Sequence, residues 1–354
     1  MLGERIKQAR IGAGLSLRGL AEKTGNYITA QVIQKYERGK SVPGSDVIIK
    51  LAEALGVKVE YFFRPDSIHV SLSAPAYRKR ASMSAKSQLA IQAKVKEQIE
   101  KQLEIESLFP ADRFKRVSIH DMKERHIKKM EDVERLAEAL RNVWSLGLDP
   151  IENLAEVLED RGTMIILLDG EDAFDGLSCW ANENIPVIVS KKGLPGDRQR
   201  SNLAHELGHL VMNVSPNIDE EKAAKRFSGA FLVPADNVYR ELGKQRNNLD
   251  LIELNFLKKK YGMSMQQWIY RAKDLGVISD SRATQLFRTF RTNNWHRTEP
   301  GYIVQEEMPQ RYRMLVLQAV SEGLISPVRA AEFLDEPYNK FRKDMMIGFE
   351  EAHT

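Results

Sequence analysis

The segment His205-Glu206-Leu207-Gly208-His209 constrains this chain more than any other. Two histidines four residues apart on a helix lie one turn from each other, so both rings can point from one face toward a single ion. Glu206 sits about 100° round the helix and can reach a metal-bound water without being a ligand. Apolar residues recur on the opposite side and Pro216 follows, which predicts a helix that ends there. The pattern is typical of zinc proteases.

A zincin also needs a third protein ligand from a following helix. The stretch from Ile218 to Phe227 offers Glu221, with Glu220 as the alternative. Two histidines can share a helix face by chance, but the chain has only seven histidines, which argues against chance. We therefore predict a zinc (Zn²⁺) site of gluzincin type with His205, His209 and Glu221 as ligands.

Other segments around this motif match one family. The stretch from Val133 to Pro234 resembles the ImmA/IrrE family of metallopeptidases, in the branch with an N-terminal Xre-type DNA-binding domain. That resemblance implies a small zincin that regulates gene expression by cutting a repressor-type partner, with Glu206 as catalytic base and His205, His209 and Glu221 as ligands. The matching segments are Leu146-Gly147-Leu148-Asp149-Pro150-Ile151, Leu158-Glu159-Asp160-Arg161-Gly162, Phe174-Asp175-Gly176-Leu177-Ser178, Pro186-Val187-Ile188-Val189, Asp197-Arg198-Gln199-Arg200 and Arg226-Phe227-Ser228-Gly229-Ala230-Phe231-Leu232-Val233-Pro234.

The chain departs from the family at one position. Many relatives have Asn or Asp four residues after the ligand Glu, where this chain has Lys225. An amide or carboxylate there would orient a ligand. A second electrophile for the reaction is not identified by spacing; Tyr239 and Arg226 are candidates, and neither is favoured.

The first 65 residues are basic and favour short helices. They hold eleven Lys and Arg against six Asp and Glu, an excess of five, whereas the whole chain carries only +4. A basic small domain fits a nucleic-acid binder, although charge alone also fits solubility. Helices are expected from Glu4 to Ala13, from the cap Ser16 to Thr24, and from Thr29 to a stop at Gly39. Short helices with a Gly-bearing connection are typical of a helix-turn-helix.

Residues 4–63 closely resemble the Cro/cI or Xre family, through Leu15-Ser16-Leu17-Arg18-Gly19-Leu20-Ala21, Tyr36-Glu37-Arg38-Gly39-Lys40 with Pro43, and Leu51-Ala52-Glu53-Ala54-Leu55-Gly56-Val57. In such folds the third helix enters the major groove. The turn Asn26-Tyr27-Ile28 is about two residues longer than in commoner members. The alternative is a module that only docks proteins. Candidates for base contacts are Thr29, Gln31, Gln34 and Lys35, and candidates for phosphate contacts are Arg18, Arg38 and Lys40.

The remaining chain is expected to be mostly helical around a short mixed or antiparallel sheet. After a break at Ser71 to Pro75, the basic run Arg78-Lys79-Arg80 favours a solvated surface over a DNA contact. A long helix with a narrow apolar seam then packs on the zinc domain or pairs with a second copy.

An edge strand beside the metal can bind an extended peptide, and either the strand from Leu177 to Trp180 or the strand from Pro186 to Ser190 could be that strand. The predicted helices are Ser84 to Leu108, Val133 to Trp144, Ile151 to Asp160, those from Leu251 onward, and a last pair from Arg311 to Phe349; the strands are Thr163 to Leu168, Leu177 to Trp180 and Pro186 to Ser190.

The composition favours a cytoplasmic protein. The single cysteine, Cys179, excludes an internal disulfide and is expected to be a small buried residue. No apolar signal core follows Met1, and no uncharged apolar run is long enough to span a bilayer, so no membrane partner is expected.

Together these features predict a multidomain, mainly α protein with a small α+β zincin domain. The predicted domains are an all-α helix-turn-helix domain at 1–65, a helical linker at 66–130, a zincin-like metallopeptidase at 131–245 and a C-terminal helical domain at 246–354.

Two functions fit this organisation. The first is a DNA-binding transcriptional regulator, acting as a homodimer on a double-stranded DNA operator, whose zinc endopeptidase domain cleaves a repressor or antitoxin-type protein, or itself. In that reaction water attacks at zinc with Glu206 as general base. The alternative is a non-cleaving antitoxin or autorepressor of a toxin–antitoxin-like module, whose zincin domain serves for docking or sensing. The substitution Glu206→Gln separates the two, because only the first loses its function.

Overall fold

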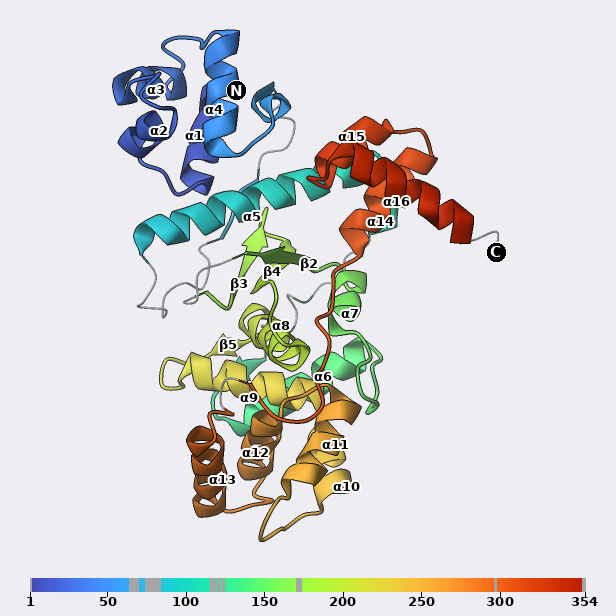
Figure 1. The fold of residues 1–354 in the computed structure, drawn as a ribbon. Coiled ribbons are helices and arrows are strands. Elements are labelled where there is room, and N and C mark those ends of the chain that lie inside the picture. Colours follow the sequence, from blue (N-terminus) through green and yellow to red (C-terminus); the bar gives the residue numbers. More distant parts are fainter. Residues whose placement is uncertain are drawn as a thin grey trace. The chain divides into compact units, whose positions relative to one another are not determined.

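A computed structural model describes most of the chain in two compact units. The described residues are 2–63, 70–73, 84–114, 119, 122, 125–169, 174–295 and 298–351, which leaves out the run Arg78-Lys79-Arg80. The first unit consists of Met1–Leu72, Tyr77–Arg113 and Arg313–Thr354, and the second of Ser73–Ala76 and Phe114–Tyr312. The protein is mainly helical with a small mixed sheet, as predicted (Figure 1). In the described residues no helix has the length and apolar character needed to cross a membrane.

The first unit begins with a helix-turn-helix built on local capping signals. Ser16, the predicted cap, accepts a hydrogen bond from the Gly19 N–H, and Thr29 accepts one from the Val32 N–H, so each caps the start of its helix. Gly25 and Asn26 adopt left-handed backbone in the turn between these helices. The elements are α1 (Leu2–Gly12), α2 (Leu17–Lys23), α3 (Ala30–Glu37), α4 (Ser45–Leu55) and the 3-10 helix η1 (Val59–Phe63), around a core that includes Ile6, Leu20, Ile33 and Leu51.

The long helix α5 (Ala85–Glu106) packs antiparallel along α1 within the same unit. Arg5 of α1 forms a nearly buried ion pair with Glu100 of α5, 2.7 Å between Nη1 and Oε2. The predicted seam is present, since Ile91, Val95 and Ile99 are buried. The contact with α1 was not predicted, because a helical seam does not identify its partner.

The C-terminal part of the first unit corrects one prediction. Instead of a helical pair, three helices follow one another: α14 (Arg311–Ser321), α15 (Pro327–Phe333) and α16 (Tyr338–Glu351). Left-handed backbone at Gly323 and Asp335 lies in the two connections. Two ion pairs join this region to α5, Lys101 with Asp335 in the second connection and Glu104 with Arg329 of α15.

The second unit contains a three-stranded mixed sheet, one of the two kinds of sheet expected from the sequence. Strand β4 (Ile185–Lys191) is central, parallel to β2 (Met164–Leu168) and antiparallel to β3 (Gly176–Ala181). Pro186 of β4 lies opposite Trp180. A proline cannot donate to the ladder, so Trp180 directs its own N–H and C=O to the outer edge, where both bond to Ser73. Within the described residues, the remaining two strands, β1 (His126–Ile127) and β5 (Asn213–Val214), form a parallel sheet.

Helix α8 (Gly196–Val211) lies between the sheet and helix α9 (Glu220–Leu232) (Figure 1). At Gly208 a Cβ atom would lie 3.0 Å from the Phe227 ring, so glycine permits the close approach of these two helices. The helices around them are α6 (Glu131–Val143), α7 (Leu154–Asp160), α10 (Ala235–Leu242), α11 (Leu251–Tyr261), α12 (Met265–Asp274) and α13 (Asp280–Thr292).

Candidate metal site and DNA-facing helix

Three potential metal ligands meet where α8 passes the start of α9. The Nε2 atoms of His205 and His209 are 3.2 Å apart. Glu221 faces both rings, with Oε2 3.5 Å from Nε2 of His205 and Oε1 3.5 Å from Nε2 of His209. Asp219 caps α9 by accepting from the backbone N–H groups of Glu221 and Lys222, which fixes the first turn and hence Glu221.

This donor set fits zinc. Four-coordinate zinc with bonds of about 2.0–2.1 Å requires neighbouring ligand atoms about 3.3 Å apart. The 3.2 Å between the two ring nitrogens and the 3.5 Å from each nitrogen to its nearer Glu221 oxygen are close to that value. Within the described residues, no other group of three His, Cys, Asp or Glu side chains is arranged to hold a metal ion.

Glu220, the alternative third ligand, occupies a different place. Its Oε1 lies 3.1 Å from Nδ1 of His209, the ring nitrogen that does not face His205. A carboxylate there can fix the tautomer and orientation of a metal-binding imidazole. Lys225, where many relatives carry the polar group, is exposed.

Glu206, which follows His205 on α8, is nearly buried, with 5% of its surface exposed. Ser178 of β3 donates a hydrogen bond from its hydroxyl to Oε2 of Glu206, over 2.9 Å. Burial, and then the charge of Glu206, raises the pKa of the neighbouring Cys179 thiol to about 12. Cys179 is therefore a buried neutral thiol, as its apolar surroundings predicted. The contact from Ser178 was not predicted, because it depends on strand register.

The two candidates for a second electrophile are engaged elsewhere. Tyr239 donates its hydroxyl to the Leu275 carbonyl oxygen at 3.3 Å. Arg226 pairs with Glu134 at 3.1 Å. Neither contact involves the candidate metal ligands.

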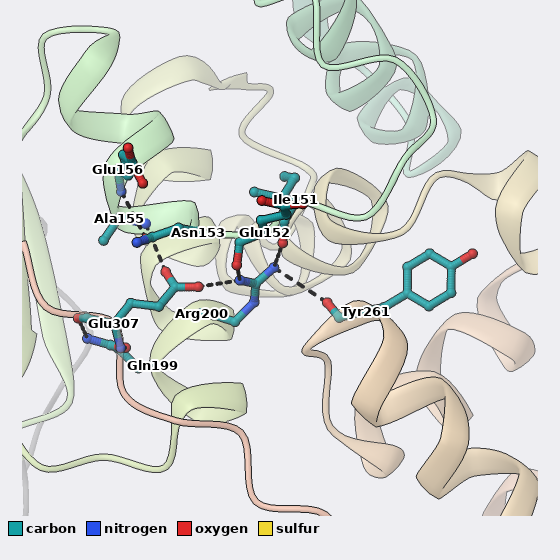
Figure 2. A network of polar contacts seen from close by, with 9 residues as sticks. All are labelled: Ile151, Glu152, Asn153, Ala155, Glu156, Gln199, Arg200, Tyr261 and Glu307. Atoms are coloured by element: carbon teal, nitrogen blue, oxygen red, sulfur yellow. Dashed lines mark hydrogen bonds and ion pairs between the residues drawn. The ribbon is translucent and has the colours of Figure 1, made fainter.

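A buried polar network fixes the N-terminal half of α8 (Figure 2). The guanidinium of Arg200, 3% exposed, pairs with Glu307 and donates to the carbonyl oxygens of Ile151 and Glu152. Glu307 also accepts from the Ala155 N–H at the start of α7. Gln199 binds both the N–H and the C=O of Glu307, at 2.7 Å each. Two segments far apart in the sequence, residues 151–155 and Glu307, thus hold the helix that carries both histidines.

The DNA-facing candidates lie mainly along one face of α3. Gln31, Gln34, Lys35 and Arg38 follow the spacing of one helical face. Six candidates are exposed, and Gln34 is half-buried. The hydroxyl of Thr29 serves as the helix cap, 3.4 Å from the Val32 nitrogen. Arg10 fixes α3 against α1 through Glu37, with Nε 2.6 Å from Oε1. The six exposed candidates are Arg18, Thr29, Gln31, Lys35, Arg38 and Lys40.

Comparison with known proteins identifies both regions. Residues 6–62 match the helix-turn-helix family, and residues 158–273 match the IrrE N-terminal-like domain. One curated relative is an uncharacterized transcriptional regulator in the ATPase CF(0) region of Rhodospirillum rubrum, 37% identical over 62 residues, which are 18% of this chain and 56% of that protein. Another is the SPbeta prophage-derived uncharacterized HTH-type transcriptional regulator YonR of Bacillus subtilis (strain 168), 38% identical over 64 residues, 18% of this chain and 57% of that protein. The chain thus spans little more than half the length of these relatives.

Proposed function

This chain contains a helix-turn-helix domain and an IrrE N-terminal-like domain, and we propose that it is a DNA-binding transcriptional regulator whose second domain is a zinc-dependent endopeptidase. Its substrate would be a repressor or antitoxin-type protein, or the chain itself. The observation that carries the proposal is the meeting of His205, His209 and Glu221 at zinc-ligand spacing beside the buried carboxylate of Glu206. We further expect a cytoplasmic homodimer bound to a two-fold operator.

Each side chain has a distinct part in the proposed reaction. His205, His209 and Glu221 would hold zinc, which when bound supplies a Lewis acid that acidifies water and polarises the scissile carbonyl. Glu206 accepts the proton of the attacking water on its carboxylate and later gives it to the leaving amine nitrogen. Glu220 keeps the His209 ring in the orientation that presents Nε2.

The sheet suggests where an extended substrate would bind. Strand β4 has a partner strand on each side, whereas among the described residues no further strand pairs with the outer edge of β3. Of the two strands considered from the sequence, β3 is therefore the one that could pair with a peptide. It also carries Ser178, which contacts Glu206. Ser73 bonds to β3 at Trp180, so a substrate strand would pair with the part of β3 nearer Gly176.

The test combines metal analysis with an unbiased substrate screen. The purified full-length protein, its Glu206→Gln variant and its His205→Ala variant are each incubated with a proteome-derived peptide library, with and without a chelator. New N-termini are then identified by mass spectrometry. We expect cuts by wild type that the chelator abolishes, zinc without cuts for Glu206→Gln, and neither for His205→Ala.

The contrary result favours the non-cleaving antitoxin or autorepressor. If wild type binds zinc and DNA but cuts neither library peptides nor itself, and Glu206→Gln behaves like wild type in DNA binding and repression, the peptidase proposal is wrong. The metal domain would then serve for docking or sensing.

A further inference from the structure

The carboxylate of Glu206 lies against strand β3 in a small, specific environment. Ser178 Oγ is 2.9 Å from Oε2, and both side chains are nearly buried, 4% and 5% exposed. Gly176 shares the same face of the strand, because side chains alternate along it. A Cβ atom at Gly176 would lie 3.5 Å from Oε1 of Glu206 and 2.8 Å from the Val189 carbonyl oxygen. Oε2 of Glu206 therefore accepts a hydrogen bond from the Ser178 hydroxyl, and Oε1 lies beside Gly176, which has no side chain.

The contact with Ser178 matters because Glu206 is the group that carries the proton in the proposed reaction. A carboxylate removed from water needs hydrogen bonds to compensate, and a bond from a neutral hydroxyl to a charged oxygen is one of the stronger kinds. Proton transfer also requires the accepting oxygen to remain within about 3 Å of its partner, so a freely rotating carboxylate would lose rate. The hydroxyl of Ser178 restricts that rotation by fixing Oε2.

We propose that Ser178 is a positioning residue for Glu206 in the peptidase reaction; this inference rests on the proposed function. Ser178 holds Oε2, so that Oε1 accepts the proton while the water oxygen bonds to the carbonyl carbon. Oε1 then gives that proton to the amine nitrogen as the carbon–nitrogen bond breaks. Glu206 ends as the carboxylate it was at the start, and Ser178 keeps its own proton throughout.

A matched pair of substitutions isolates the hydroxyl. Ser178→Thr and Ser178→Val add almost the same volume and both suit a strand, but only threonine keeps the hydroxyl. With a peptide that wild type cuts, we expect kcat to be about 10- to 100-fold lower for Ser178→Val than for Ser178→Thr. KM and zinc content should be equal in the two. In a Glu206→Gln background neither variant should cut faster than the other, because the group that Ser178 positions is gone.

A second readout does not depend on zinc or turnover. In the metal-free protein, Ser178→Thr should unfold about 2–4 °C above Ser178→Val, because only threonine can donate to Glu206. Equal Tm values would show that the hydroxyl of residue 178 forms no stabilising hydrogen bond with Glu206, and would overturn the proposal. Equal kcat values, or a Ser178→Val defect confined to KM or zinc content, would also overturn the positioning role while leaving the peptidase intact. If wild type cuts nothing, the proposed function itself is wrong and the positioning role is wrong with it.

Discussion

Helix α3, with most of the candidate DNA contacts, and the candidate metal site hold their key side chains in opposite surroundings. On α3 the side chains are mostly exposed and follow one another on one short helix. At the metal site the groups come from α8, α9 and β3, and Glu206 is almost fully buried. Side chains that act independently can be removed one at a time with additive losses, whereas groups that hold one another are coupled. The two regions should therefore respond differently to substitution.

The largest expected effect compares the adjacent carboxylates of α9. Glu221→Ala removes a ligand and should weaken zinc binding more than about 100-fold. Glu220→Ala removes the carboxylate that contacts Nδ1 of His209 and should weaken zinc binding about 10- to 100-fold. Competition with a chromophoric chelator measures both. A greater loss for Glu220→Ala would exchange the two roles.

The next effect tests the coupling of α8 to distant segments. Glu307→Gln leaves the charge of Arg200 buried without its partner and should lower the free energy of unfolding of the second unit by about 3–5 kcal/mol. The neighbouring Glu306→Gln alters only an exposed hydrogen bond with the Gly193 N–H and should cost at most about 1 kcal/mol. Urea unfolding of the full chain measures both, and equal losses would contradict a special role for the buried pair.

On the DNA side the effects should be smaller and independent. Gln31→Ala should cost about 1–3 kcal/mol of binding if Gln31 contacts a base, and should relax specificity at one position. The probe is the duplex that wild type selects from a random library, and zinc content is the control. A Gln31→Ala variant that binds every duplex as wild type does would exclude this base contact.

The smallest expected change concerns phosphate contacts. Arg38→Gln removes one positive charge from the exposed end of α3, so the slope of log K against log salt should fall by about 1 while sequence preference stays the same. Replacing Lys7, which lies on α1 outside the predicted contacts, gives the control. An unchanged slope would show that Arg38 contacts no phosphate.

Local signals in the sequence predicted much of the fold and only part of the site. Ser16 and Thr29 were predictable as caps because a cap bonds within three residues. The spacing of His205 and His209 likewise predicted their shared helix face. The pair between Arg200 and Glu307 spans 107 residues, and the Ser178 contact depends on which strand lies at the edge of the sheet. Such contacts are set by tertiary packing, which periodicity does not encode.

The central claim is that His205, His209 and Glu221 hold one zinc ion. Elemental analysis and zinc X-ray absorption of the purified wild-type protein, beside His205→Ala, test it most directly. We predict about one zinc per chain with only nitrogen and oxygen neighbours at about 2.0–2.1 Å, and its loss in the variant. A wild-type protein without zinc, or one whose zinc is unaffected by His205→Ala, would contradict the account.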